Sequence, residues 1–425
     1  MRYGLIGEKL GHSFSKIIHE QLADYTYDLI PLTKEELHDF MTQKAFSALN
    51  VTIPYKEAVM PYLDEIDEKA AKIGAVNTIV NRSGKLYGYN TDYHGFRYLM
   101  QHHHIDAAGK KVLILGKGGA CKAVSAVLED MGASEILLVY YKHAENTITY
   151  ADCYANHADA QIIVNTTPVG MYPQITESPI DLSRFSCLEA VVDVIYNPLR
   201  TKLVLHGLEQ GCTSIGGLEM LVGQAKYAVE IFRGISLQEE TIEELCQTML
   251  EEQRNIVLIG MSGCGKSTIG KLVADKLGKT FVDTDVKIIE KIGMSIADYF
   301  AVYGEASFRE IETQVIQELA GERGLVISTG GGVVKDPYNL SLLKLNGHII
   351  WIHRDLELLE SGEGRPLAPD AEATRKLYAE RLPLYTAAAE SIAENNGTEK
   401  DGVCAVLTAF QKMNQSATKP PVSFV

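Results

Sequence analysis

Short apolar runs alternate with amphipathic stretches along most of the chain. From residue 111 these runs are continuous, as in KVLIL (111–115), EILLVY (135–140), QIIVN (161–165) and AVVDVI (190–195). Strands that are apolar on both faces and separated by helical stretches are typical of a parallel sheet covered by helices. The pattern therefore predicts an α/β fold with a parallel sheet over residues 101–235.

The rest of the chain divides where this pattern changes. Residues 1–100 mix short strands, helices and polar loops, whereas residues 236–253 (SLQEETIEELCQTMLEEQ) have the charged amphipathic pattern of a helix. At NIVLIG (255–260) a fresh alternation of strands and helices begins. We expect an α/β domain over 1–100, a second over 101–235 that ends in returning helices, a helical linker over 236–253, and an α/β domain with a parallel sheet over 254–425.

Composition narrows the class of protein. The chain has 425 residues with a formal net charge of −15, which argues against general binding to nucleic acid or to anionic membranes. Its seven cysteines show no metal-binding spacing, and its first residues lack the pattern of a signal peptide. No apolar run is long enough to span a bilayer. We expect a cytoplasmic enzyme whose partners are small molecules.

The strongest chemical signal follows the strand NIVLI. Residues 260–267 (GMSGCGKS) match the phosphate-binding pattern G-x-x-x-x-G-K-[ST] in full, between a predicted strand and a predicted helix. Glycines let backbone N–H groups turn toward phosphates, while the lysine reaches the outer phosphates and the serine hydroxyl faces Mg²⁺. The candidate nucleotide-binding residues are Gly260, Gly263, Cys264, Gly265, Lys266, Ser267 and Thr268.

Further polar or glycine-rich motifs follow this loop. In chain order they are Asp283 and Asp285 in FVDTD, Arg309 in GEASFREIE, the three glycines of STGGGVV, Arg365 in SGEGRPLAPD and Arg381 in ERLPLY. Taken singly, the arginines could be surface charges and the aspartates helix caps. Their occurrence in this order behind a phosphate loop favours a single site.

With these motifs, residues 254 to about 400 resemble shikimate kinase. The resemblance implies transfer of a phosphoryl group from ATP, with Mg²⁺, to shikimate. Asp285 would bind the substrate hydroxyls and act on the attacking one, and Asp283 and Ser267 would support the metal. The remaining residues implied by the resemblance are Arg309 and Arg381 at the carboxylate, Gly331 and Gly332 along the substrate, and Arg365 closing over the transferred group.

A second glycine loop lies earlier, between the strand KVLIL and a helical stretch. Gly116, Gly118, Gly119 and Ala120 occupy it, but Cys121 stands at the third glycine position of G-x-G-x-x-G. Such a loop places a pyrophosphate at a helix N-terminus and is typical of a Rossmann-like dinucleotide domain. Alone, the incomplete fingerprint fits an empty turn as well as a cofactor loop.

Hydroxyl, amide and charged side chains recur in the loops of residues 1–100 and again near residue 220. They are Ser13, Ser15, Asn50, Thr52, Lys56, Asn77, Asp92, Tyr196 and Gln224. Their motifs (HSFS, NVTIPYKE, NTD and MLVGQ) resemble those of shikimate dehydrogenase over residues 1 to about 235. A polyhydroxylated ring acid needs many short donors and acceptors, which these residues supply.

The resemblance implies a role for each of these residues. Ser13 and Ser15 would hold the substrate carboxylate, and Lys56 with Asp92 would form the acid/base pair at the reacting oxygen. One positioned pair suffices, because hydride transfer requires a single accompanying proton transfer. The hydroxyl-reading residues would be Asn50, Thr52, Asn77, Asp92 and Gln224, with Tyr196 in the substrate site and Gly217 in the cofactor site.

The choice of dinucleotide is read at the end of the second strand of the nucleotide domain, in ILLVYYKHAENT. No Asp or Glu is present there to accept from the ribose 2′-OH of NAD, which favours NADP. The family usually has an arginine in this segment, whereas this chain has Tyr140, Tyr141 and Lys142. Lys142 or His143 could hold the 2′-phosphate, with weaker discrimination against NAD.

Three consecutive histidines, His102, His103 and His104, precede the first strand of the nucleotide domain. Their spacing matches no common metal site, so we expect them to be solvated.

Together the two resemblances predict consecutive reactions: NADP-dependent reduction of 3-dehydroshikimate to shikimate, then phosphorylation of shikimate by Mg·ATP. Three alternatives stay open from sequence. The first half could be a shikimate-binding regulatory module without turnover, or it could act on quinate as well or instead. The second half could be a generic nucleotide or sugar-acid kinase, although Arg309 and Arg381 favour an acceptor that bears a carboxylate.

Overall fold

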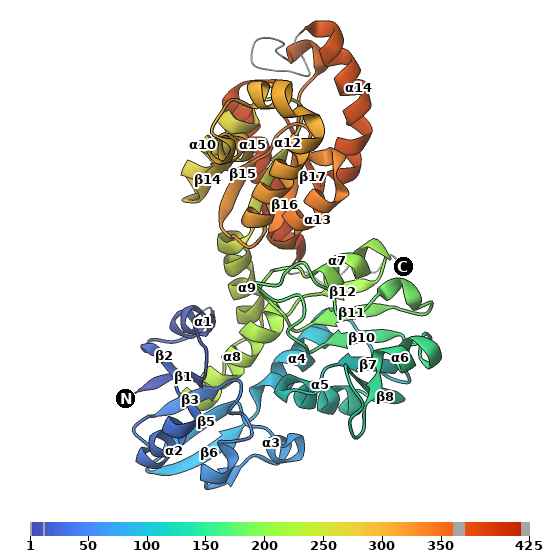
Figure 1. The fold of residues 1–425 in the computed structure, drawn as a ribbon. Helices are drawn as coiled ribbons and strands as arrows, with labels where there is room; N and C mark the ends of the chain where they lie inside the picture. The colour runs from blue at the N-terminus through green and yellow to red at the C-terminus, as the bar shows by residue number, and fades with distance from the viewer. Residues whose placement is uncertain (1, 12, 360–369, 418–425) are drawn as a thin grey trace.

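The computed structural model describes residues 2–11, 13–359 and 370–417. Three sheets divide it into a first lobe (residues 2–102), a second lobe (103–217) and a third lobe (255–417), joined by two long helices (Figure 1). Among the described residues, no helix has the length and apolar content that crossing a bilayer requires.

The first lobe is built on a mixed sheet of order β2-β1-β3-β5-β6-β4. Its strands are β1 (Tyr3–Gly7), β2 (Tyr27–Pro31), β3 (Ala48–Val51), β4 (Glu65–Ile66), β5 (Thr78–Arg82) and β6 (Lys85–Tyr89). Its helices are α1 (Ser15–Leu22), α2 (Lys34–Gln43), α3 (Glu68–Ile73) and α4 (Thr91–His102), with a 3₁₀ turn at Met60–Tyr62. The Asn90 side chain accepts from the Tyr93 N–H and so starts α4 beside the carboxylate of Asp92.

The second lobe has a fully parallel sheet of order β12-β11-β10-β7-β8-β9. The strands are β7 (Lys111–Leu115), β8 (Glu135–Tyr140), β9 (Ile148–Thr149), β10 (Ile162–Asn165), β11 (Ala190–Asp193) and β12 (Thr213–Ile215). The helices are α5 (Gly119–Asp130), α6 (Tyr150–Asn156) and α7 (Lys202–Glu209), with a 3₁₀ turn at Leu182–Arg184. The strand order reverses between β7 and β10, where doubly wound folds bind dinucleotides. The four predicted strands coincide with β7, β8, β10 and β11.

The third lobe also has a fully parallel sheet, of order β14-β15-β13-β16-β17. Its strands are β13 (Asn255–Ile259), β14 (Thr280–Asp283), β15 (Leu325–Ser328), β16 (Gly347–His353) and β17 (Ser391–Glu394). Its helices are α10 (Lys266–Leu277), α11 (Thr284–Ile292), α12 (Ile296–Ala320), α13 (Pro337–Asn346), α14 (Ala371–Ala388) and α15 (Glu399–Ala417), with 3₁₀ turns at Val333–Lys335 and Leu356–Leu358. The predicted α/β architecture is confirmed in all three lobes.

Helices α8 (Leu218–Arg233) and α9 (Glu240–Gln253) connect the lobes. Helix α8 returns from the second lobe and packs against α1 and α4 of the first, and α9 lies between α8 and α15 (Figure 1). The predicted linker helix therefore begins at Glu240 rather than at residue 236. Its apolar face, which includes Ile242, Leu245 and Met249, is buried in a cluster with Phe14 and Ile18.

The second and third lobes are also joined directly through Leu199 and Arg200. Leu199 N donates to Asn346 Oδ1 (2.9 Å), and Arg200 Nε donates to the Lys344 carbonyl (2.9 Å). The Arg200 guanidinium also contacts the Gly347 carbonyl, and it pairs with the Glu390 carboxylate, Nη1 to Oε1 at 2.5 Å. Burial acts to raise the pKa of Glu390, but Arg200 and a hydrogen bond from His348 outweigh it and hold that pKa well below its usual range. The pair thus stabilises the structure above the ordinary pKa of glutamate, and this contribution is lost in strong acid.

We predict that Arg200→Met destabilises the third lobe by about 3 kcal/mol, because it removes the main cationic partner of the Glu390 carboxylate, whose side chain is only 23% exposed. Differential scanning calorimetry should then show the midpoint of that lobe lowered by roughly 6–12 °C. Arg375→Met, at an exposed position of α14, is the control and should leave the midpoint in place. An unchanged midpoint for Arg200→Met would show that the pair does not hold the lobes together.

Candidate active sites

Lys56 and Asp92 form a close pair between the first two lobes. Lys56 Nζ lies 2.6 Å from Asp92 Oδ2, and the two side chains are only 14% and 11% exposed. Asp92 is placed by the first turn of α4, and Lys56 by the loop after β3. A carboxylate this close holds the ammonium in one position, which is what a proton donor to a fixed ligand atom requires.

A network of amides and hydroxyls surrounds this pair. Asn77 Oδ1 accepts from the Thr91 N–H (2.7 Å), and Thr91 Oγ1 lies 3.5 Å from Gln224 Oε1 on α8. Asn50 donates to the Asn77 carbonyl and to Thr78 Oγ1, and it accepts from the Tyr27 hydroxyl at 2.7 Å. Asn50 thus has both donors engaged and one acceptor position left, so it can take one hydrogen bond from a ligand hydroxyl.

Ser13 and Ser15 lie at the start of α1. Their hydroxyl oxygens are 3.0 Å apart, and Phe14 between them packs on Tyr196 with ring centroids 5.4 Å apart. Arg323 of the third lobe lies over the Phe14 ring, with its Cζ 4.6 Å from the ring centroid. Arg323 also lines a cavity of about 270 Å³ between the lobes, together with Asn197 and Tyr172.

The first glycine loop meets the Lys56 pair. Gly116 has φ +107°, and a Cβ there would lie 2.9 Å from Thr166 Oγ1. A Cβ on Gly119 would lie 3.2 Å from Lys56 Cδ, while one on Gly118 would meet open space. Since Gly118 and Gly119 open α5, the N-terminus of that helix faces the space beside Lys56. The loop therefore fits a pyrophosphate beside Lys56 and Asp92.

The remaining residues that the resemblance assigns to this cofactor lie on three different segments. Ala120 is in the first turn of α5, and Gly217 precedes α8, where a Cβ would lie 2.1 Å from the Val194 carbonyl oxygen. Lys142 is exposed after β8, with its Nζ 5.3 Å from the ring centroid of Tyr141. Lys117, which the sequence analysis did not select, donates to the Glu145 carbonyl and adds a second cation near this position.

The second glycine loop opens into a cavity of about 490 Å³ in the third lobe. Gly260, Gly263 and Gly265 all have positive φ, and Lys266 Nζ donates to the carbonyls of Gly260 and Met261 (both 2.9 Å). Ser267 Oγ donates to Asp283 Oδ2 at 2.6 Å. This arrangement suits a Mg·nucleotide, with Ser267 and Asp283 together at the metal position. Thr268 lines the same cavity, and Cys264 is buried beneath it.

The triple glycine lies flush against three charged side chains. A Cβ on Gly330 would lie 2.8 Å from Asp285 Oδ1, one on Gly331 would lie 3.3 Å from Arg381 Nη1, and one on Gly332 would lie 2.3 Å from Arg309 Nη2. Burial and the neighbouring Asp283 raise the pKa of Asp285, against the effect of Lys266 and Arg309. The predicted carboxylate and both arginines thus converge on one glycine surface.

Neither arginine is an ordinary surface charge. Arg381 is 3% exposed, and its Nε has no hydrogen-bond partner among the described residues. Arg309 pairs with Glu305 and with the buried Glu312, whose pKa is raised by burial. Arg365 falls outside the described residues.

Comparisons with known proteins show which families the chain resembles. A curated shikimate dehydrogenase (NADP(+)) from Clostridium beijerinckii is 40% identical over 260 residues, which cover 57% of this chain and 96% of the relative. Residues 5–79 match the family model of the shikimate dehydrogenase substrate binding domain. The chain belongs to the shikimate dehydrogenase family.

Solved structures extend the match over the first two lobes. The chorismate mutase/shikimate 5-dehydrogenase fusion of Clostridium acetobutylicum is 39% identical, with a TM-score of 0.54, and covers 57% of this chain and 94% of its own. The shikimate 5-dehydrogenase of Thermus thermophilus, in complex with NADP(H) and shikimate, is 28% identical with a TM-score of 0.52, over 57% and 97% of the two chains. Residues 262–412 match the shikimate kinase family model. The chain is a fusion of a dehydrogenase unit (first and second lobes) and a kinase unit (third lobe).

Several residues at these sites escaped prediction from sequence. Thr91, Thr78 and Tyr27 complete the amide network, and Tyr385 donates to the Gly331 carbonyl at 2.5 Å. Thr91 lies inside the selected NTD motif, Thr78 directly follows Asn77, and Tyr385 is the last residue of ERLPLY, so these three could have been found from their motifs. Tyr27 lies in no selected motif and meets Asn50 only in the folded chain.

We predict that Tyr385→Phe destabilises the kinase unit by about 1 kcal/mol, because the buried Gly331 carbonyl loses its hydroxyl donor. The midpoint of thermal unfolding should fall by roughly 2–4 °C. Tyr338→Phe, at a partly exposed tyrosine on α13, is the matched control and should change the midpoint little. Equal midpoints for the two variants would contradict a supporting role for Tyr385.

Proposed function

We propose that this chain reduces 3-dehydroshikimate to shikimate with NADPH and then phosphorylates the 3-hydroxyl of shikimate with Mg·ATP. One observation carries the proposal: each of two glycine loops lies beside its own group of charged side chains, the first beside Lys56 with its partner Asp92 and the second beside Asp285, Arg309 and Arg381. Both groups have the chemistry to act on a hydroxylated ring carboxylic acid. The two units therefore act on one molecule in sequence.

In the dehydrogenase unit, bound NADPH would supply the hydride to the carbonyl carbon. The Lys56 ammonium donates a proton to the carbonyl oxygen, and Asp92 holds that ammonium in line. Ser13 and Ser15 bind the carboxylate, while Thr52, Asn50, Asn77 and Gln224 bind hydroxyls. Lys142 and Lys117 offer positive charge to a 2′-phosphate, in keeping with NADP as cofactor.

In the kinase unit, Arg309 and Arg381 bind the carboxylate of shikimate against Gly331 and Gly332. The Asp285 carboxylate accepts the proton of the attacking hydroxyl. The oxygen of that hydroxyl bonds to the γ-phosphorus of ATP as the bond from this phosphorus to the β–γ bridging oxygen breaks, and ADP leaves. Lys266 and Arg365 would balance the charge on the transferred phosphoryl group, and Ser267 with Asp283 would hold the Mg²⁺ that adds to this positive charge.

The close Lys56–Asp92 pair favours a working dehydrogenase over a regulatory module that has lost turnover, since binding alone needs no proton donor. We also propose a cytoplasmic location, in keeping with seven free thiols.

The test feeds 3-dehydroshikimate, NADPH and Mg·ATP to the full chain and follows NADPH absorbance, ADP release and the mass of the product. Lys56→Ala should lower NADPH oxidation by roughly 100-fold or more and leave phosphorylation of added shikimate intact. Lys266→Ala should do the reverse, because it removes charge from the phosphates.

Lys276→Ala, at an exposed position at the end of α10, is the control and should retain both activities. If either active-site variant loses both reactions while it stays folded, the two sites are not independent. If the wild-type chain yields no shikimate 3-phosphate, the proposed function is wrong.

The raised pKa of Asp285 leads to a prediction for the acidic side, or acid limb, of the pH dependence of kcat in the kinase reaction. Since the base acts as a carboxylate, kcat should begin to fall at a higher pH than an ordinary aspartate, with its pKa of about 3.9, would allow. Asp283→Asn removes a neighbouring negative charge, so it should move this limb to lower pH even though it also lowers kcat. A limb that stays in place in Asp283→Asn would argue against Asp285 as the base.

A further inference from the structure

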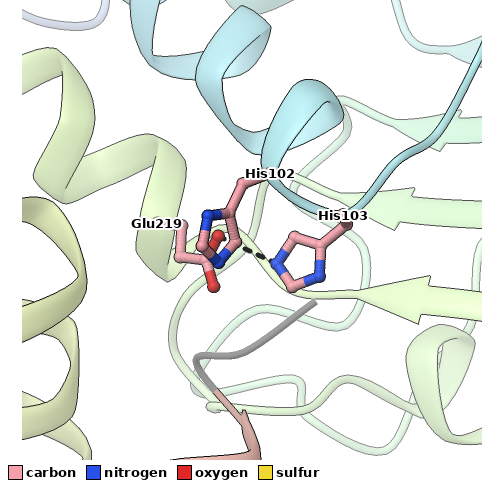
Figure 2. A group of neighbouring side chains, drawn as sticks. All are labelled: His102, His103 and Glu219. Atoms are coloured by element: carbon pink, nitrogen blue, oxygen red, sulfur yellow. Dashed lines mark hydrogen bonds and ion pairs between the residues drawn. The ribbon is translucent and has the colours of Figure 1, made fainter. Parts of the chain in front are cut away.

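A compact group of ligating side chains lies away from both active sites, where α4 ends and α8 begins. His102 is the last residue of α4, His103 follows it, and Glu219 is in the first turn of α8. One ligating atom from each side chain lies within 4.8 Å of the other two. Figure 2 shows both imidazole rings turned toward the Glu219 carboxylate.

The expectation that these histidines are solvated is wrong for two of the three. The side chains of His102, His103 and Glu219 are 9%, 8% and 10% exposed, whereas His104 is exposed. Helix α9 covers the group and buries Leu245 and Cys246 beside α8. Because α9 and α8 come from a later part of the chain, the local histidine pattern gave no sign of this burial.

The charges around the group are mainly negative. His103 Nε2 lies 2.8 Å from Glu219 Oε2, and His102 Nδ1 lies 3.6 Å from Glu243 Oε1 on α9. Within the described part of the chain, neither glutamate forms an ion pair with a lysine or arginine. After burial, Glu219 and Glu243 are the groups that raise the pKa of the neighbouring Cys246 thiol. A divalent cation would offset this charge.

The donor set selects among cations. Two imidazole nitrogens and one carboxylate oxygen suit Zn²⁺, whereas Mg²⁺ and Ca²⁺ prefer sites made of oxygen alone. Zinc–ligand bonds of about 2.0–2.1 Å in a tetrahedron separate the ligand atoms by about 3.3 Å. Nε2 of His103 and Oε2 of Glu219 would therefore move apart by roughly half an ångström.

A second layer of side chains is also present. The Tyr98 hydroxyl (3.3 Å) and the Glu243 carboxylate (3.6 Å) both face Nδ1 of His102. Histidines that bind metals commonly hold one ring nitrogen against a carboxylate or other polar partner while the second nitrogen takes the metal.

We propose that His102, His103 and Glu219, with a water molecule as the fourth ligand, hold a zinc ion that fastens the end of α4 to the start of α8, with Glu243 of α9 orienting His102. Helix α4 begins at Thr91 and Asp92, α8 carries Gln224, and α9 leads into β13 of the kinase unit. The metal would thus brace the helices that link the dehydrogenase site to the kinase unit. The proposal does not depend on either activity.

The test uses the full chain, stripped with a chelator and dialysed into excess Mg²⁺ so that the carboxylates of the kinase site are occupied. Zn²⁺ is then titrated in competition with a chromophoric zinc indicator. We expect one tightly held Zn²⁺ per chain. His103→Gln and Glu219→Gln should weaken it by at least tenfold, and Glu243→Gln should weaken it less. His104→Gln, which changes the exposed neighbour, is the matched control and should bind zinc like the wild type.

Two results would overturn the proposal. One is equal zinc uptake by the wild type and Glu219→Gln. The other needs no variant and so holds even if the substitutions impair folding: Co²⁺ added to the stripped wild-type chain should give the visible absorption of a tetrahedral site, and its absence would rule the site out. A zinc-dependent rise in the thermal midpoint of the wild type and His104→Gln, but not of His103→Gln, would support the bracing role.

Discussion

Both active sites depend on the same constraint, which is that a phosphate must reach bare backbone at the carboxyl end of a parallel strand. β7 and β13 are each followed directly by a glycine with positive φ, Gly116 at +107° and Gly260 at +145°. A side chain at Gly260 would lie 2.6 Å from the Ile352 carbonyl oxygen, so the loop could not keep its path with any other residue. From these turns α5 and α10 start with their N-termini toward the ligand.

The catalytic groups are placed relative to these turns by the topology of each sheet. In the dehydrogenase unit, the switch point between β7 and β10 sets the cofactor loop beside Lys56, which comes from a different lobe. In the kinase unit, β14 and β15 are neighbours in the sheet. The segments that follow these two strands bring Asp285 against the triple glycine. Each site therefore pairs one glycine turn with charged groups from another segment of the chain, and this shared plan allows two unrelated reactions in one chain.

Local patterns predicted the strands, the phosphate loop and the residues that lie in motifs, because those signals are contained within a few residues. They did not predict the burial of His102 and His103, since α8 and α9 cover them from more than a hundred positions away. Nor did they predict Arg200 with Glu390, or Arg323 on Phe14. These contacts join residues that are far apart in the sequence and that no local hydrophobic pattern or motif connects. They therefore form only when the lobes are assembled.

The attachment of Arg200 has a consequence for the lifetime of the protein in a cell. Arg200 lies four residues after Tyr196, so the loop that borders one active site also anchors the other unit. Partial unfolding of the kinase unit would strip that loop of its partners and expose apolar residues such as Ile175 and Leu205, which share its core. Proteases that recognise such segments would then remove both enzymes together, and the abundance of each activity would follow the weaker unit.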